Sequence, residues 1–385
     1  MSEYVKLRKE PYVAFRSRVR AFFAREVVPH ALEWERSKTL PLQLLKKCAD
    51  EGLLGLSFPV EVGGHGKDFW YEVILAEELA SAGALGWALS ILVQTNGVAP
   101  LVYELGTPEQ HVRVLKPAFR GEKYLALAAT EAVSGSDIAA IETIAEKAGD
   151  QYILSGEKRY ITNGSVAGEI LVLARISGES GIWPLGLFLV SGNTKGLQRQ
   201  RLDTIGFKSG DTAILSFNNC KIDQDGLVGK PGRGFVELLK GLQRERLIGA
   251  VALNQLSRET IERTLAMLAT RTRFGEPLIE KQVIRHRLAE LSAEVESSRA
   301  FAYIACEGFE SGESVDREVV MLKIVSYELC QRIIRECAHL WGGEAFLETH
   351  WMSHYYRDAL AFTLIAGSAE IMRDLLAGME QIQKK

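Results

Sequence analysis

The stretch "QYILSGEKRYITNG", Gln151 to Gly164, consists of two segments of alternating residue type on either side of Gly156. Alternation with a period of two is typical of half-buried β-strands, so the stretch predicts two strand segments about a glycine. Short runs rich in β-branched and aromatic residues follow it: "EILVLARI", "LGLFLV" and "TAILSFNNCKI". The sequence therefore predicts a β domain with tight turns over residues 124–233.

Helical periodicity flanks this β domain on both sides. Amphipathic segments such as "YVAFRSRVRAFFAREVVP" and "LPLQLLKKCADEGLLGL" predict a helical domain over residues 1–123. Long helical segments return from Gly234 onward, which predicts a helix bundle over residues 234–385. The expected breaks in that bundle are Phe274 to Pro277, Gly308 to Ser314 and Gly342 to Gly343. The predicted fold class is α+β.

Charge and cysteine content favour a small-molecule substrate and a reducing compartment. The 385 residues carry a net charge of -3 without a block of five or six like charges, so neither nucleic-acid binding nor a membrane-surface patch is indicated. The five cysteines are scattered and contain no C-x-x-C, which predicts neither a zinc site nor a disulfide framework. The N-terminal "MSEYVKLRKEPYVAF" has no apolar segment of a secretory signal, so we expect a cytoplasmic location.

The uncharged run from Leu79 to Tyr103 is long enough to resemble a membrane span. It is interrupted by Gln94, Asn96, Gly97 and Pro100. We therefore expect a buried helix followed by a turn, and no membrane span.

Glu245 lies on an apolar helical stripe in "QRERLIGA", between two arginines. Such an acid is either partly exposed or paired with an arginine, or it is a desolvated carboxylate with a raised pKa that can act as a general base. The small Gly249 one turn later predicts space beside the carboxylate for a non-protein group. The stripe comprises Leu238, Leu242, Glu245, Gly249, Ala252 and Leu256.

Common catalytic motifs are missing from the sequence, which contains no G-x-G-x-x-G after a strand, no P-loop, no H-E-x-x-H and no G-x-S-x-G. His350 and His354 are spaced as a possible metal pair but lack a third ligand in register, so we expect no metal site. At the edges of the β domain, "LALAATEAVSGSDIAAIETIA" and "EKRYITNG" combine a Gly-Ser turn with threonines. Free amides there suit a pyrophosphate, and the hydroxyls suit a flavin edge or a thioester.

In their order and spacing these motifs resemble the acyl-CoA dehydrogenase family over nearly the whole chain. The matching stretches are "EEL" at 77–79, "ELGTPEQHVRVLKPAFRGE", "TEAVSGSD", "GEKRYITNG", "LDTIGFKSGDTAILSFNNCKI", "LVGKPGRGF", "RTRFGEPLIEKQ", "LWGGEAF" and "YYRDALAFTLIAGSAEIMR". The resemblance implies an N-terminal helical domain, a middle β-sandwich or barrel, and a C-terminal four-helix bundle. It also implies FAD as cofactor.

The family pattern carries FAD contacts over to named positions. Tyr160 stands where Trp or Phe usually lies against the flavin, and Ser368 stands for the usual Thr. His339 replaces a usual Gln, and Ala345 replaces the second Gly of "GGxGF". A second group reaches the FAD of a neighbouring subunit, so a homo-oligomer, dimer or tetramer, is implied. Own-chain contacts are Leu127, Thr130, Gly135, Ser136, Tyr160, Thr162 and Ser368, and the contacts to the neighbour are Arg271, Phe274, Gln282, His339, Gly342 and Gly343.

The catalytic base departs from the commonest family pattern. Many members carry a Glu where this chain has Ala366, whereas the isovaleryl-type and long-chain-type enzymes carry it on the earlier helix, at the position of Glu245. The resemblance implies that Glu245 removes the α-proton of an acyl thioester while hydride leaves the β-carbon for flavin N5. The Ala366 amide would bind the thioester oxygen, and Ser136, Arg246 and Gly367 would contact substrate. The small Ala366 favours a branched or long acyl group.

The sequence leaves several functions open. The dehydrogenase would yield a trans-2-enoyl-CoA and pass electrons to an electron-transfer flavoprotein. The same fold could act on an acyl carrier protein thioester, or as an oxidase or monooxygenase. A hypothesis of another class is a catalytically silent flavoprotein that serves as a binding module.

Overall fold

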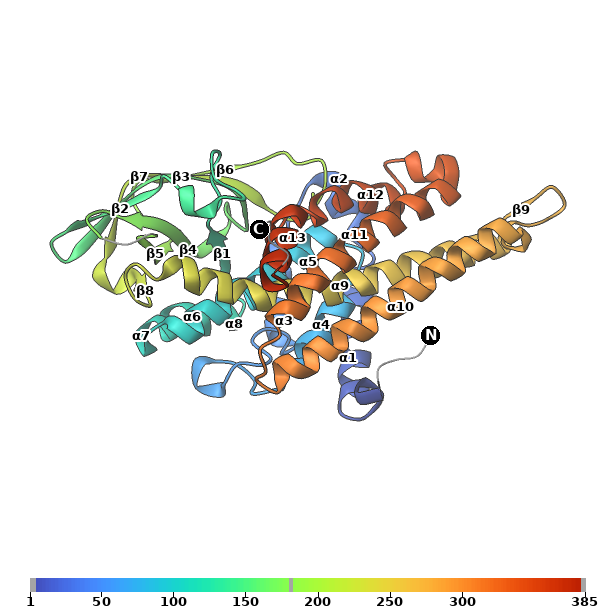
Figure 1. The fold of residues 1–385 in the computed structure, drawn as a ribbon, viewed down its shortest axis with the longest axis horizontal. Helices are drawn as coiled ribbons and strands as arrows, with labels where there is room; N and C mark the ends of the chain where they lie inside the picture. Colours follow the sequence, from blue (N-terminus) through green and yellow to red (C-terminus); the bar gives the residue numbers. More distant parts are fainter. Residues whose placement is uncertain (1–4, 180–182, 382–385) are drawn as a thin grey trace.

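The computed structural model describes residues 5–179 and 183–381, which form a helical segment, a β-sheet and a second helical segment (Figure 1). The first four residues of the N-terminal stretch, on which the expected location partly rests, lie outside the described residues. The N-terminal helices are α1 Tyr12–Glu26, α2 Ala31–Ser37, α3 Leu42–Asp50, α4 Phe69–Ser81, α5 Leu85–Leu92, α6 Ala99–Leu105, α7 Pro108–Gln110 and α8 Lys116–Phe119.

The run predicted as a buried helix followed by a turn begins at the end of α4, and from Leu85 onward it is one continuous helix. Helix α5 passes through a π-helical segment, η3 (Val93–Val98), directly into α6. The predicted turn is wrong because the polar side chains find partners without breaking the helix. Gln94 Oε1 accepts from the amide of Leu125, in the following β segment, at 3.0 Å, and the Thr95 hydroxyl donates to the Ile91 carbonyl at 2.9 Å. The helix Leu85–Leu105 is long and apolar enough for a membrane span, but 89% of its apolar window is buried inside the fold.

The middle segment forms an eight-stranded sheet in the described chain, in the order β6-β7-β3-β2-β4-β5-β8, with β1 beside β4. Strand β1 runs parallel to β4, and β3 runs antiparallel to β7. The strands are β1 Tyr124–Ala128, β2 Ile144–Ala148, β3 Gln151–Thr162, β4 Ala167–Ile176, β5 Leu185–Ser191, β6 Leu197–Arg201, β7 Thr212–Asp223 and β8 Leu227–Val228.

The two segments predicted about Gly156 form a single strand, β3. Its pairing with β7 shifts register between Leu154 and Gly156 and again between Lys158 and Ile161. Gly156 has a φ of 142°, and a Cβ there would lie 2.6 Å from the Thr143 hydroxyl. The glycine therefore marks a bulge with close backbone approach and not a turn.

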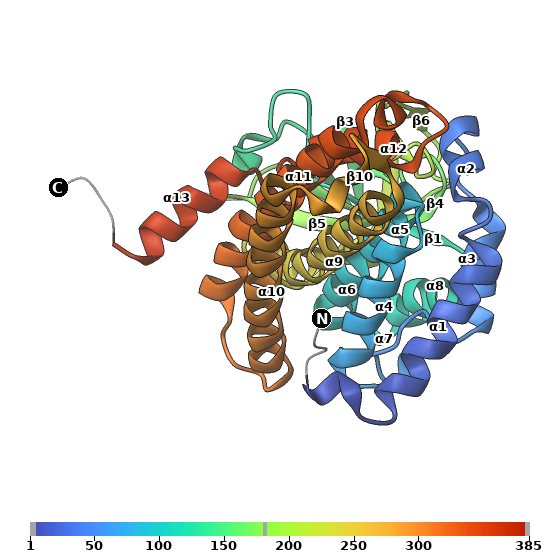
Figure 2. The same ribbon diagram turned by 90° about the vertical axis from the view of Figure 1, so that its right-hand side faces the viewer.

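The C-terminal segment contains three long helices, α9 Gly234–Thr270, α10 Gln282–Glu310 and α11 Asp316–Trp341, with the shorter α12 Trp351–Phe362 and α13 Ala369–Met379 against α11. A short hairpin, β9 Thr272–Arg273 and β10 Glu276–Pro277, joins α9 to α10. Figure 2 shows α9 between α4 and α10, so α9 packs against helices of both helical segments. The hairpin, the connection between α10 and α11, and the end of α11 before Gly342 confirm the three breaks that the sequence predicts. The order of a helical, a β and a second helical segment confirms the predicted fold class. The domain limits at 124 and 234 stay predictions.

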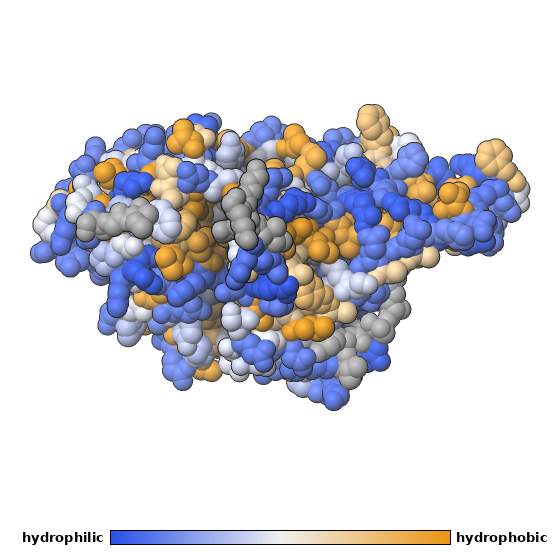
Figure 3. Space-filling view, viewed as in Figure 1, coloured by the Kyte–Doolittle hydropathy of each residue, from blue (hydrophilic) through white to orange (hydrophobic). Residues whose placement is uncertain are grey.

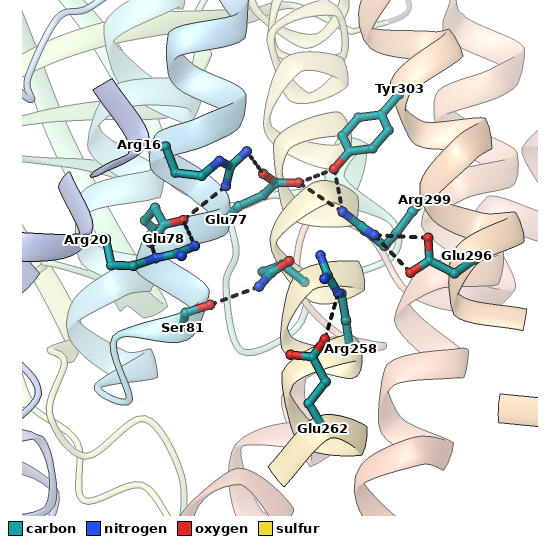
Figure 4. Close-up of polar contacts among 11 residues, drawn as sticks. Arg16, Arg20, Glu77, Glu78, Ser81, Arg258, Glu262, Glu296, Arg299 and Tyr303 are labelled. Atoms are coloured by element: carbon teal, nitrogen blue, oxygen red, sulfur yellow. Dashed lines mark hydrogen bonds and ion pairs between the residues drawn. The ribbon is translucent and has the colours of Figure 1, made fainter. Parts of the chain in front are cut away.

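A buried charged network holds α1, α4 and α10 together (Figure 4). The guanidinium of Arg16 pairs with Glu77 at 2.5 Å and with Glu78 at 3.0 Å, and all three side chains are almost completely enclosed. The hydroxyl of Tyr303 donates to Glu77, and Arg299 contacts that hydroxyl at 2.9 Å. Because buried charges are tolerated only when paired, this network fixes how the three helices pack.

Candidate functional site

Glu245 lies in the middle of α9, half-buried as a residue, with its Oε2 atom enclosed. In the described part of the chain, this oxygen has no hydrogen-bond partner. Loss of solvent raises the pKa of the Glu245 carboxyl, and the positive charges of Arg246 and Lys323 oppose that rise. The structure therefore favours a desolvated carboxylate over an exposed or arginine-paired one.

The space predicted beside the carboxylate at Gly249 is filled by protein, and the carboxylate lies against Gly97. A Cβ at Gly249 would lie 1.9 Å from the hydroxyl of Tyr327, so protein fills that side. At Gly97, in the π-helical segment η3, a Cβ would lie 3.0 Å from Glu245 Oε2. π-Helical turns recur at functional sites, and this one brings bare backbone against the acid.

The two arginines that flank Glu245 are both engaged elsewhere. Arg244 donates to Asn96 Oδ1 at 3.0 Å and to the Ser57 hydroxyl at 2.7 Å. Arg246 donates through Nε to the Ala366 carbonyl at 2.9 Å and through a terminal nitrogen to Gln243 at 3.0 Å. Helix α9 is thus tied to η3 by one arginine and to the loop after α12 by the other.

The loop from 363 to 368 brings Ala366 against Arg246, the residue that follows Glu245. Ala366 has a φ of 54° and Gly367 a φ of 96°, conformations that L residues rarely adopt and that the Arg246 contact helps to hold. The backbone amides of Leu364 and Ile365 donate to Ala361, and that of Ala369 donates to Thr363. Within residues 5–179 and 183–381 the amide of Ala366 has no such acceptor, so it is available to a ligand.

Tyr160 and Thr162 lie at the end of β3, where the second register shift occurs. Tyr160 has a φ of 62° and is 64% exposed, so the bulge turns its ring outward from the sheet. Asn163, which follows, donates through Nδ2 to the carbonyls of Leu125 at 3.0 Å and Ser90 at 2.9 Å. This amide fixes the end of β3 against β1, the strand that carries the half-buried Leu127.

The loop after Thr130 is held from inside by a buried ion pair. Lys158 Nζ lies 2.7 Å from Glu131 Oε1 and donates to the Ala129 carbonyl at 2.9 Å. Burial lowers the pKa of Lys158 to about 8, and Glu131 opposes that change. Gly135 and Ser136 are exposed on this loop, with their backbone free to approach a ligand.

The residues expected to reach a neighbouring subunit lie far from Tyr160 in the same chain. They gather around the hairpin and the end of α11, at the opposite end of the molecule from the sheet (Figure 1). Arg271 donates to the Trp341 carbonyl at 2.9 Å, which ties the hairpin to Gly342 and Gly343. Phe274 is 94% exposed, and Figure 3 shows isolated apolar residues on that otherwise hydrophilic end. Gln282 begins α10, and His339 is exposed near the end of α11.

Three other predicted positions have structural roles. The Ser368 hydroxyl accepts from the Ile371 amide at 3.4 Å and caps α13. His350 caps α12, and His354 is buried with Nδ1 2.9 Å from Arg357. Among the residues described, no group of three or more His, Cys, Asp or Glu could hold a metal ion.

Sequence profiles of one family match all three segments. The acyl-CoA dehydrogenase N-terminal domain matches residues 9–122, the middle domain residues 126–220 and the C-terminal domain residues 232–379. The chain belongs to the acyl-CoA dehydrogenase family. It is an FAD-dependent oxidoreductase that acts on the CH–CH bond of acyl-CoA thioesters.

Relatives and solved structures agree with this assignment. The long-chain specific acyl-CoA dehydrogenase of Sus scrofa is 32% identical over 366 residues, 94% of this chain and 85% of that protein. The isovaleryl-CoA dehydrogenase of Oryza sativa subsp. japonica is 28% identical over 375 residues, 96% of this chain and 91% of that protein. The crystal structure of an acyl-CoA dehydrogenase from Geobacillus kaustophilus is 31% identical, with a TM-score of 0.94 over the full length of both chains.

The residues present fit FAD. The outward ring of Tyr160 can lie against a planar ring system, and the exposed Gly135–Ser136 turn offers backbone amides to a pyrophosphate. The amide of Ala366 and the enclosed oxygen of Glu245 each lack a protein partner within the described ranges. These contacts of individual residues with FAD stay predictions.

Sequence reasoning missed four residues that build the site. Lys158 occupies an inward position of β3, Asn163 follows Thr162 directly, and Lys323 and Tyr327 are buried on α11. A lysine on the apolar stripe of a helix was the available signal for Lys323, since an unpaired charge at such a position is costly. The partners of these side chains lie on other elements, which the periodicity of one element does not reveal.

Gly97→Ala tests the contact between η3 and the base. The added methyl would stand 3.0 Å from Oε2, closer than ordinary contact, so it would displace the carboxylate and place an apolar group against it, and the pKa of Glu245 should rise. Since we predict that Glu245 acts as a base in its carboxylate form, we expect the acid limb of flavin reduction to move to higher pH, with a loss of about three- to tenfold near that limb. Stopped-flow reduction across pH measures it. Gly378→Ala, on open surface of α13, is the matched control, and equal profiles for the two variants would refute the contact.

Proposed function

We propose that this protein converts a long-chain or branched-chain acyl-CoA to the trans-2-enoyl-CoA, with Glu245 as the base. The observation that carries the proposal is the enclosed Oε2 atom of Glu245, which has no hydrogen-bond partner in the described chain and faces the bare backbone of Gly97. Ala366, at the other family position for a base, has no side chain that can accept a proton. Glu245 is therefore the acid placed for the chemistry.

The protein's own groups divide the work of proton removal. Glu245 takes the α-proton on Oε2, and its raised pKa makes the carboxylate a stronger base than a solvated one. The Ala366 amide donates to the thioester oxygen, where negative charge develops as the proton leaves. When bound, FAD accepts the hydride from the β-carbon. Arg246, already engaged with Ala366, holds this amide in place and does not need to contact the thioester.

The remaining parts of the proposal concern substrate and partners. The small Ala366 leaves room near the base, which supports a long or branched acyl group, as the names of the relatives from Sus scrofa and Oryza sativa suggest for this chain. Ser136 and Gly367 are the further substrate contacts that we propose. The distant group around Arg271 and Phe274 supports a homo-oligomer in which it contacts the FAD of another subunit. We propose an electron-transfer flavoprotein as the acceptor.

Anaerobic titration with thioesters tests the proposal. We expect long or branched acyl-CoAs to bleach the flavin absorbance at stoichiometric concentration, because hydride leaves the β-carbon once Glu245 removes the α-proton. Straight short-chain acyl-CoAs and the same acyl groups on acyl carrier protein are the comparison arms. Bleaching by the carrier-protein thioesters alone would show that the substrate is carried by acyl carrier protein and not by CoA. Bleaching by none of the thioesters would overturn the proposed reaction.

A further inference from the structure

A buried lysine that the proposed reaction does not use lies on α11, the helix that packs against α9 and its Glu245. Lys323, on α11, is 2% exposed, and its ammonium has two partners. It donates to the Phe362 carbonyl at 3.0 Å, and it lies 3.4 Å from the centre of the Tyr327 ring. A carbonyl and an aromatic face stabilise a cation without neutralising it, so the charge of Lys323 remains available to its surroundings.

The first partner connects Lys323 to the loop that carries Ala366. Phe362 is the last residue of α12, and the loop from 363 to 368 begins directly after it. Carbonyl groups at the end of a helix lack intrahelical donors, so a buried ammonium there anchors the helix end. Arg246 holds the other end of the same loop through the Ala366 carbonyl. The loop is thus fixed by one cation at each end.

The second partner connects Lys323 to the base. The hydroxyl of Tyr327 packs against Gly249 and lies 3.5 Å from the Arg246 carbonyl, on the same face of α9 as Glu245. The charged and titratable groups around the base are therefore Arg246 on α9, and Lys323 and Tyr327 on α11. The guanidinium of Arg246 is committed to Ala366 and Gln243, which leaves Lys323 as the further cation of this cluster.

We infer that Lys323 is a positioning residue for the dehydrogenation: its ammonium keeps Glu245 ionised and anchors the α12 end of the loop that carries Ala366. The inference rests on the proposed role of Glu245 as base. A carboxylate in a site without water needs a nearby positive charge to remain ionised at neutral pH. One side chain on α11 then serves both the proton acceptor and the donor to the thioester oxygen.

The directions of the pKa shifts of Lys323 and Glu245 agree with this arrangement. Burial and the charge of Arg246 lower the pKa of Lys323 to about 7, and Glu245 opposes that change. Lys323 in turn opposes the raised pKa of Glu245. Because each charge stabilises the other, removal of the lysine charge should move the ionisation of Glu245 to higher pH.

Two substitutions separate the charge of Lys323 from its anchoring role. Lys323→Gln can still donate to the Phe362 carbonyl but carries no charge, whereas Lys323→Arg keeps the charge. In the FAD-loaded protein we expect Lys323→Gln to shift the acid limb of flavin reduction upward by roughly one pH unit or more, while Lys323→Arg stays near the wild type. Lys46→Met, which removes an exposed lysine from α3, is the control and should not move the limb.

Infrared titration supplies a readout without turnover. The carboxyl band of Glu245 is assigned by its absence in Glu245→Gln, and its midpoint should shift upward in Lys323→Gln by the same amount as the acid limb. If Lys323→Gln does not retain FAD, Lys323→Met serves as the second uncharged variant, and its midpoint should shift upward in the same way while that of Lys323→Arg stays near the wild type. An unshifted midpoint in the folded uncharged variant would overturn the inference, and so would a shift of equal size in Lys323→Arg. Failure of every thioester to reduce the wild type would overturn only the proposed function, because the infrared coupling is measured without substrate.

Discussion

Glu245→Gln should keep FAD and bind acyl-CoA but lose flavin reduction by roughly 10³-fold or more. The amide has nearly the shape of the carboxyl, yet it cannot accept the α-proton. Ala366 cannot replace it, and the neighbouring Arg244 and Arg246 are cations engaged with other groups. Stopped-flow reduction under anaerobic conditions, with thioester affinity measured separately, distinguishes loss of chemistry from loss of binding.

The stability of the same variant separates chemistry from misfolding. The pKa of Glu245 is raised in the fold by desolvation. The unfolded chain therefore releases this proton at lower pH, and folding is increasingly disfavoured as the pH rises from the unfolded pKa through the folded one. Gln carries no such penalty, so at pH 7 the variant should be at least as stable as the wild type. Normal reduction by Glu245→Gln would show that another group is the base.

Arg16→Met should destabilise the fold by about 3–5 kcal/mol, because it leaves the buried Glu77 and Glu78 without their shared cation. Glu77 is left with the contacts from Tyr303 and Arg299, and Glu78 with the contact from Arg20 (Figure 4). Denaturant unfolding of the FAD-loaded protein, followed by circular dichroism, gives the change in free energy from the shift of the midpoint.

A matched surface pair provides the control for this prediction. Arg258 lies 3.0 Å from Glu262 one helical turn away, and the Glu262 side chain is 47% exposed, so Arg258→Met should cost less than about 1 kcal/mol. The double variant Arg16→Met, Glu77→Gln should recover part of the loss, since it removes one of the carboxylates left uncompensated. Equal effects of Arg16→Met and Arg258→Met would show that the enclosed network is no more important than a surface pair.

Several parts of the fold follow from local pattern. Gly234 onward has the helical period that α9 shows, and the breaks at the hairpin, after Glu310 and at Gly342 follow from glycines and a proline at those points. The bulged β3 and the continuous helix through η3 were not predicted. In both cases the sequence signal was a glycine or a polar residue, which marks a turn equally well when its hydrogen-bond partners are unknown.

For the site, the helical periodicity of α9 alone placed Glu245 on an apolar face. The family resemblance predicts Glu245 as the base, because the other family position for a base is occupied by Ala366. The pattern assigned the open side to Gly249, but Tyr327 from α11 fills that side, and Gly97 from η3 lies against the carboxylate.

The sequence by itself determined the order of helical and β segments and the family, and it led to the prediction that Glu245 accepts the proton, because these depend on residue type and on spacing within one element. Only the tertiary structure decided the environment of that residue: the loss of water around Oε2, the bare backbone of Gly97, the loop of Ala366 and the charge of Lys323. These groups come from α9, η3, α11 and the loop after α12, and their effect on Glu245 depends on distance and burial, which no single element of the sequence specifies.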